Sequence, residues 1–239
     1  MIRLLLFKML FIAQLSIMHA AVPPVQKCSL SDSECIKSSA QAFVPLISGG
    51  IPELGIEPLD VMKVDKIKID LAGLNLAVKD IDAKGLKKSV IESIKLDMAK
   101  KHLRVVLHTD MTVKGKYKAS GMLLILPISG DGDLTIKLKG IQLDMTFPYD
   151  VIKNENGKDV IDLKSVTFKH DVKGGVHFDL TNLFNGNKEL STAMLTFMNE
   201  NWPALSQEFG GPMLQKPVHK IFEAIKIYLQ SQPLEETTV

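Results

Sequence analysis

The histidines are the side chains of this sequence best suited to metal binding or proton transfer. Beyond residue 20 they are His102, His108, His170, His177 and His219. No two of them have the H-x-H, H-x-x-x-H or H-E-x-x-H spacing that would direct two imidazoles at one metal ion. The sequence therefore predicts neither a metal site nor a bound cofactor.

Other catalytic patterns are also missing from the sequence. It has no G-x-S-x-G nucleophile elbow, no phosphate-binding P-loop and no G-x-G-x-x-G motif after a strand. Asp131 and Asp133 form an acidic pair, but they alternate with Gly130 and Gly132, which is typical of a solvated turn. Because acid–base catalysis needs positioned partners, we expect that the protein is not an enzyme.

The N-terminal segment has the features of a secretory signal peptide. Arg3 and Lys8 lie around a mostly apolar run that reaches Met18, and the small residues Ala20 and Ala21 follow. A transmembrane anchor is the alternative, but the run is interrupted and shorter than the roughly 20 apolar residues that span a bilayer. We expect residues 1–20 to be removed, with the cut after Ala20 or Ala21. Residues 21–239 would then form one secreted domain without a stable membrane anchor.

Cys28 and Cys35 come shortly after this segment. Disulfides persist in the compartments through which secreted proteins pass, so we expect one bridge between these two residues. The loop that the bridge would close is short and would restrain the unfolded chain only modestly. Its expected role is to hold the N-terminal segment in place.

The charge balance argues against nucleic acid as a partner. The full chain has 29 basic and 27 acidic residues, and loss of Arg3 and Lys8 with the signal peptide would leave equal numbers. Nonspecific affinity for nucleic acid rests mostly on basic side chains that neutralise phosphates. We therefore expect no nucleic-acid binding.

The spacing of apolar residues predicts a short helix followed by many strands. Between Cys35 and Ile47 the apolar residues recur at steps of three and four, which indicates an amphipathic helix. Prolines and a glycine between Ile51 and Leu59 predict an extended connector. From Val64 to Leu180 apolar and polar residues alternate repeatedly, which is typical of antiparallel strands with one buried face.

Three local features of the strand region carry further predictions. The alternation changes phase after Gly140, which predicts a β-bulge that keeps apolar residues on the buried face. The uninterrupted apolar run Met122–Leu126 predicts a strand covered on both sides. Gly174 and Gly175 predict a tight hairpin turn.

After Leu180 the spacing of the apolar residues becomes helical. It predicts one long helix or two helices in line, with a weak point at 210–212 and kinks at Pro203, Pro212 and Pro217. Some forty helical residues would extend about 60 Å, so the helix needs an equally long partner, and a curled sheet is the only candidate. Strands followed by a long helix, without βαβ alternation, favour an α+β fold.

Four short motifs follow one another along the chain: the pair Cys28 and Cys35, the connector 50–60, the run 182–186 and the run 199–202. Together, over about residues 28–234, they resemble the insect takeout and haemolymph juvenile-hormone-binding protein family. The resemblance implies a highly curved antiparallel β-sheet wrapped around a long C-terminal α-helix, a TULIP-like lipid-binding fold. It also implies an elongated apolar tunnel between the sheet and the helix.

Members of this family carry terpenoid hormones or other lipidic ligands in haemolymph and sensory tissues. The resemblance therefore implies a secreted carrier, expected to be monomeric, of a small hydrophobic ligand of terpenoid, prenyl, carotenoid or fatty acyl type. Blood carriers of juvenile hormone typically have a second cysteine pair, which this chain lacks, so the sequence is closer to the takeout branch.

Two other functions stay open at this point. The protein could present a hormone or tastant to an unknown receptor as an extracellular signalling or chemosensory protein. It could also transfer lipid at membranes, although the neutral charge expected after cleavage argues against docking on anionic bilayers.

The apolar face of the C-terminal helix is the predicted ligand-binding surface. Such a face either lines a hollow or packs against solid core, as protein interiors do by default. A hollow lined by aliphatic, methionine and aromatic side chains has the composition of an apolar ligand pocket. The predicted lining residues are Met194, Phe197, Met198, Trp202, Leu205, Phe209, Val218, Ile221 and Ile225.

Overall fold

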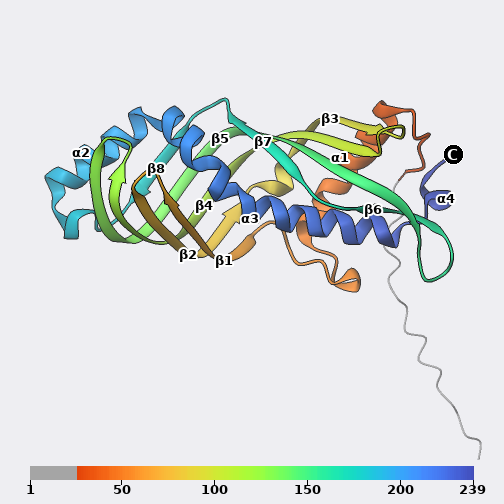
Figure 1. The fold of residues 1–239 in the computed structure, drawn as a ribbon, viewed down its shortest axis with the longest axis horizontal. Coiled ribbons are helices and arrows are strands. Elements are labelled where there is room, and N and C mark those ends of the chain that lie inside the picture. Colours follow the sequence, from red (N-terminus) through yellow and green to blue (C-terminus); the bar gives the residue numbers. More distant parts are fainter. Residues whose placement is uncertain (1–25) are drawn as a thin grey trace, which may run out of the picture.

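The computed structural model describes residues 26–239 (Figure 1). The expected signal peptide, residues 1–20, lies outside this range. In the described chain a short helix, an eight-stranded antiparallel sheet and a long helix follow one another. The predicted α+β fold, with a curved sheet wrapped around the C-terminal helix, is confirmed.

Helix α1, Ser33–Gly49, corresponds to the predicted short helix. Asp32 caps its N-terminus by accepting hydrogen bonds from two backbone N–H groups of the first turn. Gly50 ends the helix with a φ of 85°, and a Cβ at this position would lie 2.8 Å from the backbone nitrogen of Pro58. The connector that follows was predicted to be extended, but it includes a 3-10 turn, η1, Pro52–Leu54.

The two longest strands, β4 (His102–Leu123) and β5 (Leu126–Lys153), pair with each other at the centre of the sheet. β1 pairs with β2, and each of the other strands pairs with the outer edge of β4 or β5. β2 and β3 lie end to end along β4. β8 and β7 lie end to end along β5, and β6 pairs with the end of β5. The strands are β1 (Met62–Leu71), β2 (Leu74–Lys84), β3 (Val90–Asp97), β4 (His102–Leu123), β5 (Leu126–Lys153), β6 (Asp159–Leu163), β7 (Thr167–Val172) and β8 (Val176–Leu180).

The predicted bulge at Gly140 is confirmed. Thr109 of β4 pairs with Ile141 of β5, whereas Met111 pairs with Leu138, so β5 carries one extra residue between these pairs. Ile141 after the bulge is fully buried, and Leu138 before it packs against the core. The extra residue thus keeps both halves of β5 facing the interior.

The prediction for Met122–Leu126 was wrong. This run is the tip of the β4–β5 hairpin, where Leu124 has a φ of 55° and the side chain of Ile125 is 77% exposed. A run of apolar residues does not by itself distinguish a doubly covered strand from an apolar hairpin tip.

The predicted hairpin at Gly174 and Gly175 was also wrong. β7 and β8 are both antiparallel to β5, so the chain keeps its direction through the two glycines. The N–H of Gly174 donates to the carbonyl of Lys139, next to the bulge of β5. The glycines therefore separate β7 from β8, which follow one another along β5, and they lie opposite the bulge of β5.

Asp131 and Asp133 lie within β5 and not in the predicted turn. Their glycine neighbours allow another backbone segment to come close, because a Cβ at Gly132 would lie 2.5 Å from the carbonyl oxygen of Thr181.

The C-terminal part forms two helices, α2 (Lys188–Glu200) and α3 (Trp202–Ser231), separated at Asn201. Pro203 stands at the start of α3, where a proline fits without loss of an intrahelical bond. α3 continues through the predicted weak point at 210–212, and its axis bends along its length (Figure 1). Two short turns, η2 (Leu86–Lys88) and η3 (Phe184–Gly186), and a last helical turn, α4 (Leu234–Thr237), complete the described chain.

Candidate functional site

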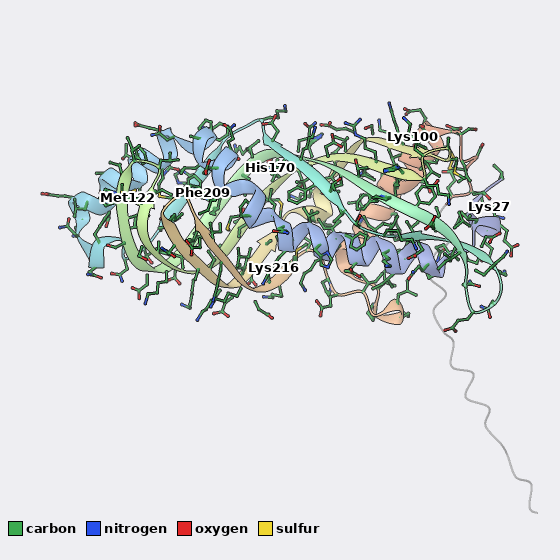
Figure 2. The ribbon with its side chains drawn as sticks, viewed as in Figure 1. Lys27, Lys100, Met122, His170, Phe209 and Lys216 are labelled. Carbon is green, nitrogen blue, oxygen red and sulfur yellow. A yellow bond between two sulfur atoms is a disulfide. The ribbon has the colours of Figure 1, made fainter. Side chains whose placement is uncertain are left out.

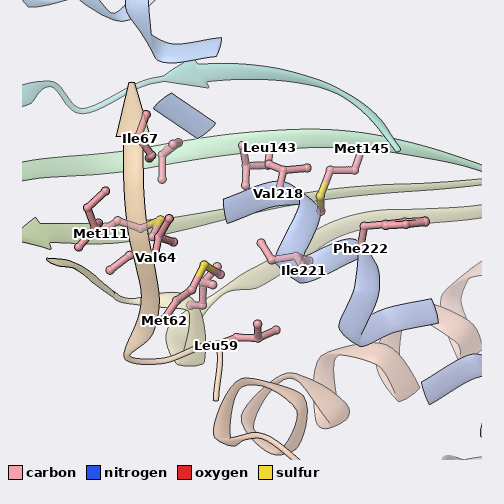
Figure 3. Packing of buried hydrophobic residues seen from close by; sticks show 14 of the residues in the cluster. Leu59, Met62, Val64, Ile67, Met111, Leu143, Met145, Val218, Ile221 and Phe222 are labelled. Carbon is pink, nitrogen blue, oxygen red and sulfur yellow. The ribbon is translucent and has the colours of Figure 1, made fainter. Parts of the chain in front are cut away.

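Helix α3 crosses the concave face of the sheet and presents its apolar side to it. Val218, Ile221 and Phe222 are buried among side chains of the sheet, and Figure 3 shows Val218 beside Leu143 of β5. Their spacing of three and four residues places them on one side of the helix. The sheet and the helix do not fill the space between them completely, and among the cavities that remain two lie along α3.

The larger cavity, with a volume of about 270 Å³, lies between α1 and the C-terminal half of α3. We call it the α1 cavity. Its lining comes from the apolar face of α1, from β3 and the first part of β4, and from the segment around Cys28. Its principal apolar lining residues are Ile36, Ala40, Phe43, Val44, Ile47, Ile91, Ile94, Leu103, Val105, Leu107, Ile161, Ile221, Ile225 and Leu229.

The second cavity, of about 160 Å³, lies between the first half of α3 and the part of the sheet nearest the β4–β5 hairpin tip. We call it the hairpin cavity. It is lined by β1, β2, β7 and β8 as well as by β4 and β5. In Figure 2, Met122 marks the end of the molecule near the hairpin cavity, and Lys27 marks the end near the α1 cavity.

The two cavities adjoin. Leu86 and Ile221 line both of them, so the cavities meet at these two side chains. The arrangement is an interrupted apolar channel along α3, with Leu86 and Ile221 at the interruption. We call these two residues the neck.

Among the described residues, no Asp, Glu, Lys or Arg lines either cavity. His170 lines the hairpin cavity, and one of its ring nitrogens, Nε2, lies 3.0 Å from the carbonyl oxygen of Ser206 on α3. Tyr228 lines the α1 cavity, and burial raises the pKa of its phenol to about 12. Tyr228 therefore stays an uncharged hydroxyl over the physiological pH range. The surroundings favour an apolar, uncharged molecule.

The predicted lining residues fall into two groups. Met198, Leu205, Phe209 and Val218 line the hairpin cavity, Ile225 lines the α1 cavity, and Ile221 lines both. Met194, Phe197 and Trp202 line neither of these cavities. Met194 is buried in the core at the α2 end, and Trp202 lies 4.0 Å from the Cβ position of Gly175. These three residues of the predicted stripe thus pack against the core.

Sequence reasoning missed the contribution of α1 and of two hydroxyl groups. The apolar stripe of α1 was recognised as a helix face, and its part in the α1 cavity depends on contact with α3, which local spacing does not encode. Ser89 and Tyr228 also line this cavity. No local pattern marks either of them as a site residue.

The predicted disulfide between Cys28 and Cys35 is confirmed, with a Cα–Cα distance of 5.7 Å. Cys28 is buried and lines the α1 cavity. Its N–H donates to the carbonyl of Thr237, so the bridge joins α1 to both ends of the described chain. The disulfide therefore fixes the wall at the outer end of the α1 cavity.

Among residues 26–239, no group of three His, Cys, Asp or Glu side chains is placed to hold a metal ion. No helix within residues 26–239 combines the length and hydropathy needed to cross a membrane.

The chain is similar in sequence to a known family and to several known proteins. The family model described as haemolymph juvenile hormone binding protein matches residues 6–237. The circadian clock-controlled protein daywake of Drosophila melanogaster is 30% identical over 214 residues, which cover 84% of this chain and 82% of the relative. A putative beta-carotene-binding protein of Schistocerca gregaria is 23% identical over 196 residues, covering 76% of each chain.

A solved structure shares the architecture. The crystal structure of Takeout 1 from Epiphyas postvittana matches with a TM-score of 0.87 and 45% sequence identity. The match covers 90% of this chain and 99% of the other. The similarity thus spans the curved sheet and the long helix.

Proposed function

The chain belongs to the haemolymph juvenile hormone binding protein family, and we propose that it is a secreted carrier that binds one small hydrophobic molecule in the channel along α3. The observation that carries this proposal is the pair of adjoining apolar cavities without a charged lining residue among those described. Solid cores are packed to high density, and a hollow of this size in a core is uncommon. Burial of a ligand's apolar surface would supply the binding free energy.

The proposed ligand is a long, thin apolar molecule of terpenoid, prenyl, carotenoid or fatty acyl type. The shape follows from the two cavities, which lie one behind the other along α3 and meet only at the neck. The name of the Schistocerca gregaria relative, a putative beta-carotene-binding protein, supports a ligand of this class. The high identity to Takeout 1 favours the takeout branch of the family over the blood carriers of juvenile hormone.

Secretion is part of the same proposal. The disulfide, the haemolymph family and the signal-like residues 1–20 all support it. We propose that residues 21–239 form the secreted protein as one monomeric domain. N-terminal sequencing of protein collected from the medium of expressing insect cells tests the cleavage, and an intact residue 1 on medium protein would contradict it.

Native mass spectrometry of the protein purified from its own tissue tests the carrier function. We expect an added mass on the native protein that disappears on denaturation, and extraction should recover an apolar compound. Displacement of the fluorescent probe N-phenyl-1-naphthylamine by isoprenoids and fatty acyl compounds provides an independent measurement. A protein that carries no added mass and binds no compound of the series is not a carrier.

A further inference from the structure

Two buried hydroxyl groups of the α1 cavity have no hydrogen-bond partner. They are Oγ of Ser89 and the phenol oxygen of Tyr228. Within residues 26–239, these are the two buried side-chain oxygens or nitrogens that lack a hydrogen-bond partner. Both residues are only 4% exposed, and both line the α1 cavity. A buried hydroxyl without a partner is unfavourable for the folded protein, so each such group calls for an explanation.

The other hydroxyls that line the same cavity are satisfied within the chain. Ser39 donates to the carbonyl of Gln26 and Ser48 to that of Pro45. Thr237 and Thr238 both donate to the carbonyl of Leu234, and Thr237 also to that of Pro233. Ser89 and Tyr228 therefore differ from the neighbouring serine and threonine residues because their hydroxyls lack a hydrogen-bond partner, and their residue type does not explain this difference.

The backbone of Ser89 is held firmly, which leaves its hydroxyl as the free group. Its N–H donates to the carbonyl of Leu86 (3.0 Å), and its own carbonyl accepts from Nε2 of Gln41 on α1 (3.0 Å). Oε1 of the same Gln41 accepts from the N–H of Ile91 (2.7 Å). Gln41 thus ties the start of β3 to α1 and fixes Ser89 at the cavity wall.

Tyr228 is positioned by packing. Its ring lies 4.0 Å from the ring of Phe43 on α1, measured between centroids. Phe43 also lines the cavity, so the two rings form part of one wall. The ring is therefore fixed, while the hydroxyl has no acceptor in the described chain.

We propose that the hydroxyls of Ser89 and Tyr228 form the polar subsite of this channel and donate hydrogen bonds to an uncharged oxygen at one end of the ligand. The inference rests on the proposed carrier function and adds the chemistry and direction of binding. The ligand would place a carbonyl, ester or hydroxyl oxygen in the α1 cavity and direct its hydrocarbon part past the neck into the hairpin cavity. A carboxylate is disfavoured there, because no lysine or arginine among the described residues lines the cavity to pair with it.

Three ligands of equal carbon number separate the possibilities: 2-tridecanone, tridecane and tridecanoic acid. Their affinities are measured at pH 7.5 by displacement of N-phenyl-1-naphthylamine from the wild-type protein and from Ser89→Ala and Tyr228→Phe. Each substitution removes one hydroxyl and little else. We expect each variant to bind 2-tridecanone about two- to tenfold more weakly than the wild type does, with the affinity for tridecane unchanged.

Tyr117→Phe is the matched control. The phenol of Tyr117 donates to the carbonyl of Thr181 (2.7 Å) and lies outside both cavities. Without ligand, Tyr117→Phe should lower the melting temperature. Tyr228→Phe should leave the melting temperature unchanged or raise it, because it removes a hydroxyl that has no partner. Tyr117→Phe should bind the ketone and the alkane as the wild type does, because Tyr117 lines neither cavity.

The possible outcomes are distinct. If none of the three ligands binds the wild type, the carrier function fails and the subsite with it. If all three bind and both hydroxyl variants keep the wild-type ratio of ketone to alkane affinity, the carrier function stands and the polar subsite is overturned. Tighter binding of tridecanoate than of 2-tridecanone would overturn the preference for an uncharged oxygen.

Discussion

Leu86 and Ile221 each line both cavities, Leu86 from the turn η2 and Ile221 from the second half of α3. Both side chains are buried, with exposed fractions of 6% and 7%. A ligand longer than one cavity must therefore pass these two residues. The neck offers a direct test of whether the channel is used as a continuous site.

Ile221→Trp should limit the length of ligand that the protein accepts. In the wild type, affinity for a series of methyl ketones should rise by about fourfold for each added methylene, as expected for transfer of a methylene from water. In the variant the rise should stop at the chain length that fills the α1 cavity, because the indole obstructs the neck. Probe displacement measures the series, and circular dichroism checks the fold.

Met198→Trp is the comparison for this variant. Met198 lines the hairpin cavity alone, so added bulk there should stop the rise in affinity at a longer chain than Ile221→Trp does. Equal slopes in the wild type and both variants would mean that the ligand does not occupy the channel along α3.

Two neighbouring glycines of α3 should respond in opposite ways to alanine. A Cβ at Gly210 would lie 2.3 Å from Nε2 of His170, whereas a Cβ at Gly211 meets nothing within 4 Å. Gly211→Ala should raise the free energy of unfolding by about 0.5–1 kcal/mol through helix propensity. Gly210→Ala should leave the protein at least about 1 kcal/mol less stable than Gly211→Ala, because it displaces His170 from Ser206.

Urea unfolding of the two alanine variants measures this difference. Combining Gly210→Ala with His170→Ala should remove most of the penalty, because the clash needs both side chains. A Gly210→Ala protein as stable as Gly211→Ala would show that the imidazole moves aside freely.

Asp162 should make stability depend on pH in the acid range. A hydrogen bond from Lys164 and the charge of Lys226 hold the pKa of Asp162 below its ordinary value of 3.8, against the opposing effect of burial. Gln230 on α3 also donates to this carboxylate (2.8 Å), so Asp162 joins β6 to α3. A lowered pKa means that the stabilisation is fully present above the unfolded-state pKa, near 3.8, and is lost as the pH falls through the folded-state value.

Asp162→Asn should therefore lower the free energy of unfolding by about 1–2 kcal/mol at pH 7, and the gap to the wild type should close below about pH 4. Asp171→Asn is the control, because Asp171 pairs with Lys173 on the open surface, and such pairs contribute little. A gap for Asp162→Asn that is constant from pH 7 to pH 3 would contradict the ionic role.

The three tyrosines of the chain should ionise at a higher pH than a free phenol does. Burial raises the pKa of Tyr117 and of Tyr228 to about 12, and burial also raises that of Tyr149. Absorbance at the phenolate band should therefore show ionisation of the folded protein displaced to pH values above 10, but a normal step near pH 10 in urea. Because the unfolded phenols ionise first, stability should fall as the pH rises above about 10. A full step near pH 10 in the folded protein would mean that the phenols are solvated.

The sequence predicted features that depend on residue periodicity. The alternation of apolar residues on either side of Gly140 predicted a bulge, and the pairing of Ile141 with Thr109 confirms it. Periodicity did not predict how elements meet at long range. Gly174 and Gly175 have the composition of a hairpin turn, but β7 and β8 both pair with β5, and this partner choice is not encoded by the two glycines.

Residue periodicity likewise predicted only part of the candidate site. The helical stripe correctly indicated that Leu205, Phe209, Val218 and Ile221 face the interior of the sheet. It could not separate residues that line a hollow from those, such as Met194, that pack against protein. The polar groups of the α1 cavity could not be predicted, because a serine after η2 and a tyrosine on α3 line one cavity only through the folded positions of α1 and α3.

The order of the sheet and α3 along the chain has a consequence for synthesis on the ribosome. The β4–β5 hairpin can form early, because its contacts spread outward from a tip at Leu124 and Ile125. α3 (Trp202–Ser231) follows all eight strands, so it cannot pack on their apolar concave face until it has itself emerged. The nascent chain thus exposes a long apolar surface while the strands are being translated, a state that invites aggregation and binding by chaperones. A chain that stops before α3 would keep this surface exposed permanently.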